Sequence, residues 1–181
     1  MPVEPSPSHN RNEEKIRPVH GNFKPGRHPA VAARPLAELL DCPTETSLLL
    51  TGAAESLLVA AGDTVFHQNN ACKGLYLVVS GEFLRKSERL NSRITLGTGR
   101  PGDLVELAAA LGDGHHTYTM TALTPGSLLM LPISALRQAF DHHPPLRMRL
   151  LEELAREVSR AYRSCSLSRP VPVHRNGASL L

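Results

Sequence analysis

The chain has 181 residues, of which 41% are hydrophobic and 4% aromatic, so one domain with a core of Leu, Val, Ala and Ile is expected. No apolar run approaches the roughly 18 residues of a membrane span, and the polar, proline-rich start does not resemble a signal peptide. The net charge of +3 lies in the tails, because residues 35–166 hold 12 basic and 14 acidic residues. This central part offers no excess of positive charge to DNA, which argues against direct DNA binding.

The first 34 residues predict a disordered arm, because six prolines stand among polar residues with few large hydrophobic side chains. Residues 35–54 indicate a pair of short helices, carried by the segments PLAELL and TETSLLL. The chain therefore begins its folded part at about residue 35.

From Ser56 onward the pattern changes to short apolar runs divided by turn residues, which is typical of a barrel, sandwich or roll. A short alanine-rich segment, Glu106 to Leu111, predicts one or two helical turns inside this β region. The apolar runs are SLLVAA, TVFHQ, LYLVVSGEFLRK, RITLG, TYTMTAL and SLLMLPI.

After Ile133 the pattern becomes helical, and Pro144-Pro145 separates a short helix from a long one. The long helix carries apolar residues spaced 3, 4, 3 and 4 apart, which is the pattern of a coiled-coil seam. Its other positions include six charged residues between 152 and 163, and the tail at 167–181 shows no periodicity. The predicted seam, and with it a dimer interface, consists of Leu151, Leu154, Val158, Ala161 and Cys165.

The sequence shows no pattern of a catalytic or metal centre. It lacks a nucleophile elbow, a zinc-protease HExxH motif and a Walker loop, so we expect no enzymatic activity. The histidine pairs at 115–116 and 142–143 are adjacent, so their side chains diverge, and no metal is expected. Cys42, Cys72 and Cys165 are widely spaced, which favours reduced thiols in the cytoplasm.

Two strings carry a resemblance to a known family. VFHQNNACKGLYLVVSGEFLR and GDLVELAAALGDGHHTYTMTALTPGSLLMLP, followed by the long helix, resemble the sensor half of the CRP/FNR regulators over roughly residues 36–165. The resemblance implies a mainly β fold with flanking helices. Its centre is a jelly-roll-like antiparallel β-roll of about eight strands, of the cyclic-nucleotide-binding-domain type, followed by a long dimerisation helix. The family continues with a winged helix-turn-helix, which about 16 further residues are too few to build, so none is expected here.

The expected domain organisation follows from the resemblance and the patterns together. It consists of a disordered arm at 1–34, a sensor domain at 35–143, a long C-helix forming the dimer seam at 144–166, and a flexible tail at 167–181.

The Gly-Asp-Leu loop and the short helix resemble the family's phosphate-binding cassette. The resemblance implies that Glu106 holds the ribose 2′-hydroxyl, and that His116 and Thr117 stand where the family has a phosphate-binding arginine and a Ser/Thr. Tyr162 on the long helix matches a position that contacts the base. The candidate ligand-binding residues are Gly102, Asp103, Leu104, Glu106, Leu107, His116, Thr117 and Tyr162.

Two alignments of this cassette remain open, because the chain is one residue short between Gly102 and Glu106. The first places Glu106 on the ribose glutamate. The second places Glu106 on a glycine, which leaves no ribose ligand and resembles the FNR-like branch. The iron–sulfur sensing of that branch is excluded, because the first 41 residues contain no cysteine.

These observations predict a CRP/FNR-type regulatory sensor domain that binds a small effector between residues 102–122 and the long helix. The first candidate effector is a cyclic nucleotide, cAMP or cGMP. Binding would reposition the long helix at the seam of a homodimer. The alternatives are a degenerate dimerisation or interaction module that binds nothing, and a truncated transcription regulator that acts through a full-length CRP/FNR partner. Neither direct DNA binding nor a membrane is expected.

Overall fold

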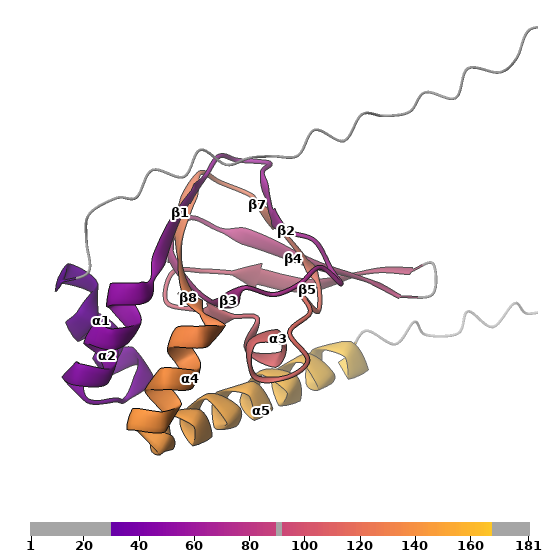
Figure 1. The fold of residues 1–181 in the computed structure, drawn as a ribbon. Helices are drawn as coiled ribbons and strands as arrows, with labels where there is room; N and C mark the ends of the chain where they lie inside the picture. The colour runs from indigo at the N-terminus through magenta and orange to yellow at the C-terminus, as the bar shows by residue number, and fades with distance from the viewer. Residues whose placement is uncertain (1–29, 90–91, 168–181) are drawn as a thin grey trace, which may run out of the picture.

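The computed structural model describes residues 30–89 and 92–167, which form two four-stranded sheets (Figure 1). One sheet has the strand order β1-β8-β3-β6 and the other has the order β2-β7-β4-β5. All strand pairs are antiparallel, and the chain crosses from one sheet to the other after every strand except β4, which pairs with the following β5 in the same sheet. The predicted antiparallel β-roll is therefore confirmed. The strands are β1 (Glu55–Val59), β2 (Thr64–Phe66), β3 (Gly74–Ser80), β4 (Phe83–Arg89), β5 (Ser92–Gly99), β6 (Leu104–Val105), β7 (Thr119–Ala122) and β8 (Gly126–Pro132).

Helices flank the roll, as the sequence predicted. Figure 1 shows α1, α2 and α4 gathered beside the roll, while α5 runs past the short α3. In the described ranges 30–89 and 92–167, no helix is both long and apolar enough to cross a membrane. The helices are α1 (Ala30–Leu40), α2 (Thr44–Ala53), α3 (Leu107–Leu111), α4 (Ile133–His142) and α5 (Pro144–Leu167).

The interior of the roll is an apolar cluster with an unusual share of the chain's aromatic side chains. The whole sequence has four Phe and three Tyr residues, and Phe66, Tyr76, Phe83 and Tyr118 all belong to this cluster. Valine, alanine, leucine and methionine side chains from both sheets complete it. The sheets therefore hold large rings in the space where a roll of this size has room for a ligand.

A second apolar cluster lies between the helices and the first sheet. It contains Leu36 of α1, Leu50 of α2, Leu136 of α4, and Leu146 and Leu150 of α5, all nearly inaccessible to solvent. Leucines at positions 146 and 150 share one face of α5 because they are one helical turn apart. This cluster fixes the first half of α5 against the rest of the domain.

The start of the folded part differs from the prediction. α1 begins at Ala30, so residues 30–34 are helical rather than part of the arm, and Pro35 lies inside the helix. The segment AVAAR has high helix propensity, which the density of prolines before it concealed. Residues 1–29 and 168–181, which hold the remainder of the predicted arm and nearly all of the predicted tail, lie outside the described residues.

The long helix presents two faces, and they differ from the predicted seam. Leu154 is half-buried and packs against the helical cluster, so it is partly used within its own chain. Val158 and Tyr162 are 59% and 74% exposed. The side chains of Ala161 and Cys165 lie outside the described residues. A neighbouring set, again spaced 3, 4, 3 and 4, forms an exposed face that we call the outer stripe: Met148, Leu151, Ala155, Val158 and Tyr162.

Candidate functional site

The cassette segment begins with a tight turn at Gly102 and Asp103. The Gly102 N–H donates to the Val78 carbonyl (2.9 Å), and the Val78 N–H donates to the Asp103 carbonyl (3.0 Å). Gly102 has a φ of 93°, a conformation that glycine adopts without strain. Both turn residues are exposed, and the Asp103 carboxylate accepts a hydrogen bond from the Arg100 N–H. These residues shape the turn that leads into β6, where Leu104 is half-buried.

Glu106 joins β6 to α3 with backbone angles of φ 70° and ψ 27°. This left-handed conformation costs a residue other than glycine roughly 1–2 kcal/mol. The angles favour the alignment that places Glu106 on a family glycine. The Glu106 side chain nevertheless lies in the interior, because the residue is only 1% exposed. A carboxylate therefore reaches the interior of the cassette even though its backbone occupies a glycine position.

The structure brings Glu106 and His116 together. Glu106 Oε2 lies 3.4 Å from His116 Nδ1 and accepts a hydrogen bond from the Thr117 N–H at 3.3 Å. Both side chains are almost fully buried. Among the described residues, Glu106 Oε1 and His116 Nδ1 have no hydrogen-bond partner, because the 3.4 Å contact is an ion-pair distance without hydrogen-bond geometry. Buried polar atoms normally have partners, so this pair retains binding capacity in the protein interior.

Aromatic side chains close the space around this pair. The His116 ring stacks on Phe66, with centroids 3.9 Å apart and planes inclined by 4°. The Tyr118 hydroxyl accepts a hydrogen bond from the Glu106 N–H at 3.2 Å, and the Tyr76 ring lies 6.0 Å from the imidazole. Burial raises the pKa of both tyrosine hydroxyls well above the ordinary value, so they stay protonated. These rings thus line the space around the buried pair.

Cys72, to which the sequence assigned no role, lies beside the pair. Its position is set by backbone bonds between residues 69–72 and 114–116, including Cys72 N–H to Gly114 O (2.7 Å) and Asn69 N–H to His116 O (2.8 Å). Cys72, Glu106 and His116 each place one potential metal-ligand atom within 4.8 Å of the other two. No sequence spacing revealed this cluster, because its members come from a turn, a helix start and a loop that are distant along the chain.

The thiol of Cys72 is itself buried. Burial raises its pKa to about 11, and the thiol donates a hydrogen bond to the Gly74 carbonyl at 3.2 Å. The free protein therefore holds this group as a neutral thiol at neutral pH.

An ion pair connects the roll to the long helix near this site. Arg85 Nη1 of β4 lies 2.8 Å from Glu157 Oε1 of α5, and both side chains are mostly buried. The Arg85 guanidinium also lies 5.7 Å from the centre of the Tyr118 ring. Leu107, the first residue of α3, packs in the same cluster as Leu146 and Leu150 of α5. The cassette and α5 are thus joined by one polar and one apolar contact region.

Replacing Glu157 with glutamine is expected to raise the stability at pH 7 and to leave it nearly unchanged near pH 4. Burial raises the pKa of Glu157, and the nearby Arg85 only partly offsets this effect. The pKa of Glu157 is higher in the folded state than in the unfolded state, where it is about 4.3. The contribution of this group to the free energy of unfolding is therefore fully present below the unfolded-state pKa and is lost as the pH rises through the folded-state pKa. Glutamine cannot ionise and keeps that stability. Urea unfolding from about pH 4 to 7 measures the difference.

Glu153 on the same helix is the matched control, because hydrogen bonding to Arg160 lowers its pKa. Glu153→Gln is expected to show the opposite sign, with a small loss of stability at neutral pH that disappears in acid. A Glu157→Gln variant that is clearly less stable than the wild type at pH 7 would contradict the prediction, since the ion pair with Arg85 would then outweigh burial.

The other predicted ligand-binding residues lie apart from the buried pair. Leu107 is buried in the helical cluster, and the Thr117 side chain is exposed. Tyr162 stands on the outer stripe of α5, on a different face from the buried Leu146 and Leu150.

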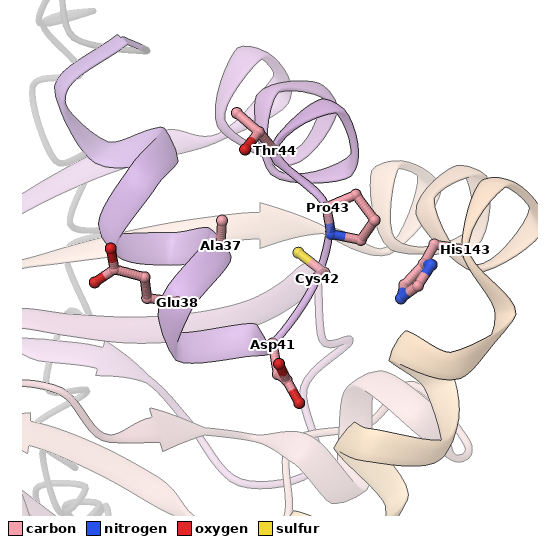
Figure 2. A pocket seen from close by; sticks show the side chains of 7 residues that line it. All are labelled: Ala37, Glu38, Asp41, Cys42, Pro43, Thr44 and His143. Atoms are coloured by element: carbon pink, nitrogen blue, oxygen red, sulfur yellow. The ribbon is translucent and has the colours of Figure 1, made fainter.

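A shallow surface hollow lies where the α1–α2 connection meets the turn before α5 (Figure 2). Cys42 points into this region, and burial, followed by the nearby Asp41, raises the pKa of its thiol. None of the predicted site residues lines it. The lining residues are Ala37, Glu38, Asp41, Cys42, Pro43, Thr44 and His143.

Comparisons with known proteins agree on the fold. Residues 57–143 match the family described as the cyclic nucleotide-binding domain. The catabolite activator protein of Thermus thermophilus is 26% identical with a TM-score of 0.61, over 70% of this chain and 59% of that protein. The sensor domain of the regulator DNR from Pseudomonas aeruginosa is 17% identical with a TM-score of 0.64, over 84% of this chain and 98% of that domain, which supports the fold alone.

A curated relative is similar over a shorter stretch. The lysophospholipase NTE1 of Eremothecium gossypii is 32% identical over 107 residues, which is 58% of this chain but 7% of that protein. The chain thus spans a small part of that enzyme and about three fifths of the Thermus regulator. With the two sheets and the cassette segment in place, residues 57–143 form a cyclic-nucleotide-binding-like sensor domain.

Proposed function

We propose that the chain is a regulatory sensor whose effector binds at Glu106 and His116 and whose output is the position of α5. The observation that carries the proposal is the buried carboxylate–imidazole pair, which has polar atoms without partners inside the roll. Glu106 directly precedes α3, and α3 packs on α5, so a rearrangement of Glu106 alters the support of the long helix. The Arg85–Glu157 pair adds a second contact that such a rearrangement disturbs.

A cyclic nucleotide is the effector whose chemistry suits this pair. The Glu106 carboxylate accepts a hydrogen bond from a ribose 2′-hydroxyl, and a ring N–H of His116 with the neighbouring Thr117 meets the cyclic phosphate. Phe66 and His116 stack on each other in the space that the nucleotide would enter. Binding requires that stack to open, so some of the binding energy is spent on the rearrangement that reaches α5.

The outer stripe of α5 supports a homodimer. Met148, Leu151, Val158 and Tyr162 are all among the exposed large hydrophobic side chains, and they repeat at coiled-coil spacing. The opposite side of α5 carries the ion pairs of Glu153 with Arg156 and Arg160, which suits a face in solvent. A second copy of this chain, with its own α5 stripe, is the proposed partner.

A second candidate function is favoured by the filled interior of the roll. His116 replaces the family's phosphate-binding arginine, and aromatic rings occupy the space around it. In this alternative the domain binds no effector and acts by pairing its α5 with another chain, such as a full-length CRP/FNR regulator. The two functions differ in whether the cassette binds anything.

Calorimetric titration of the metal-free protein with cyclic AMP, cyclic GMP and a non-cyclic nucleotide tests the proposal. We expect saturable binding of one cyclic nucleotide per chain, weakened at least about tenfold in Glu106→Gln, because a neutral amide replaces the charged acceptor. His116→Arg is expected to tighten binding about tenfold, since a guanidinium forms a two-pronged contact with phosphate. His115→Ala, at the exposed neighbouring position, should change nothing. If neither the folded wild type nor His116→Arg releases heat with any of the nucleotides, the proposal is contradicted. The second candidate function, a domain that binds no effector and acts through α5, then remains.

A further inference from the structure

We propose that Cys72, Glu106 and His116 form a site for a divalent transition metal ion, with zinc as the natural occupant. The three residues offer a thiol, a carboxylate and an imidazole, which are the ligand types that zinc takes in proteins. Their candidate ligand atoms lie within 4.8 Å of one another, and all three residues are buried. This inference goes beyond the sensor function, and a separate measurement tests the metal site.

The distances between the groups match a metal site more closely than a hydrogen bond. Glu106 Oε2 and His116 Nδ1 are 3.4 Å apart without hydrogen-bond geometry. Ligand atoms of a tetrahedral zinc ion, at bond lengths of about 2.0–2.3 Å, are separated by roughly 3.3–3.7 Å. The Cys72 Sγ lies within 4.8 Å of a candidate ligand atom of each of the other two residues, and metal binding would turn it away from its bond to the Gly74 carbonyl.

Two unsatisfied atoms point to a missing partner. Among the described residues, Glu106 Oε1 and His116 Nδ1 lack any hydrogen-bond partner, and their residues are only 1% and 3% exposed. A buried carboxylate is costly unless it is paired or coordinates a metal. A divalent ion bound by one thiolate, one carboxylate and one neutral imidazole gives a site with no net charge, which suits an apolar interior.

The surroundings hold the ligands in place. Phe66 stacks on the His116 ring and fixes its plane, while the Thr117 N–H binds Glu106 Oε2. The backbone pairing of residues 69–72 with 114–116 keeps Cys72 beside His116. Such supporting contacts orient metal ligands in advance, which raises affinity. The three protein ligands leave a fourth position for a small molecule or water.

The metal and the proposed nucleotide use the same two residues, so they compete. Metal binding holds Glu106 and His116 together in the closed arrangement, whereas a nucleotide requires them to separate. A metal ion therefore stabilises the ligand-free state of the sensor and is expected to weaken cyclic-nucleotide binding at least about tenfold.

Cobalt titration of the reduced, nucleotide-free chain tests the site. We expect one Co²⁺ per chain, with a thiolate-to-cobalt charge-transfer band and visible bands of tetrahedral cobalt, both displaced by Zn²⁺. Zn²⁺ should also raise the thermal unfolding midpoint by several degrees. The charge-transfer band should vanish in Cys72→Ser, and the tetrahedral spectrum should vanish in His116→Ala. Both signals should persist in the controls Cys42→Ser and His115→Ala, which change the same residue types outside the cluster.

Several outcomes overturn the metal site. If the folded wild-type chain shows no charge-transfer band with Co²⁺, the metal site is contradicted, whatever the variants show. If the band persists in Cys72→Ser and disappears in Cys42→Ser, the metal ligand is Cys42, and the proposed site is wrong. The nucleotide titration is performed with a chelator present, so its result does not depend on metal binding. Metal binding without nucleotide binding contradicts only the proposed function, and nucleotide binding without metal binding contradicts only the metal site.

Discussion

Replacing Val158 with glutamate is expected to weaken self-association of the chain at least about 100-fold. Val158 is 59% exposed within the outer stripe, and in a symmetric, parallel pair of α5 helices the same residue of each copy meets near the axis. The substitution therefore places two carboxylates at one seam, with a cost of about 3 kcal/mol, which corresponds to that change in the dissociation constant. Sedimentation equilibrium over a range of protein concentrations measures the constant.

The charged side of α5 offers the control for this experiment. Arg156→Glu introduces the same side chain on the face where Arg156 pairs with Glu152 and Glu153, and surface ion pairs contribute little to stability. We expect its dissociation constant to stay within about threefold of the wild type, because this face points away from the stripe. A wild-type chain that remains monomeric at high concentration would contradict the dimer. A Val158→Glu dimer of unchanged strength would exclude the stripe as its seam.

The seam illustrates what periodicity can predict and what it cannot. The predicted seam and the outer stripe follow the same 3-4 spacing and share Leu151 and Val158, but the seam continues through Leu154 and Ala161 where the stripe has the next residue along the chain. Periodicity predicts that such a face exists, but only packing decides which register is free. Leu154 contacts the helical cluster of its own chain, so the exposed register is the stripe.

The roll itself was predictable because its signal is local. Short apolar runs end at turn residues, and glycines such as Gly62, Gly81 and Gly102 take positive φ values at those turns. The start of α1 was missed because the composition of the arm concealed a short alanine-rich stretch. Local patterns thus determined the type of each element, while its boundary depended on the tertiary contacts around it.

The candidate site, in contrast to the roll, was predicted from the sequence only in part. Glu106 and His116 were found through the family resemblance, but their direct contact and the left-handed backbone of Glu106 are products of folding. Cys72 carried no signal, because its partners lie in distant segments joined by the pairing of residues 69–72 with 114–116. A cluster assembled by long-range pairing has no fixed spacing, so sequence motifs alone do not find it.

Replacing Gly74 with alanine is expected to lower the free energy of unfolding by about 3 kcal/mol. Gly74 begins β3 and faces Pro132 across the ladder with β8. An added Cβ would stand 2.6 Å from the Met130 sulfur and 2.8 Å from the Leu131 carbonyl carbon, and closer still to the Leu131 oxygen. The side chain of Met130 can rotate but the Leu131 backbone cannot, so the two strands must separate. Urea unfolding measures the loss.

Gly52 provides a control of opposite sign. It lies in α2, is exposed, and an added Cβ there would meet no atom within 4 Å. Glycine within a helix is less stable than alanine by roughly 0.5–1 kcal/mol, so Gly52→Ala is expected to stabilise the chain by up to that amount. If both variants changed stability equally, the close approach of β3 and β8 would not be the cause.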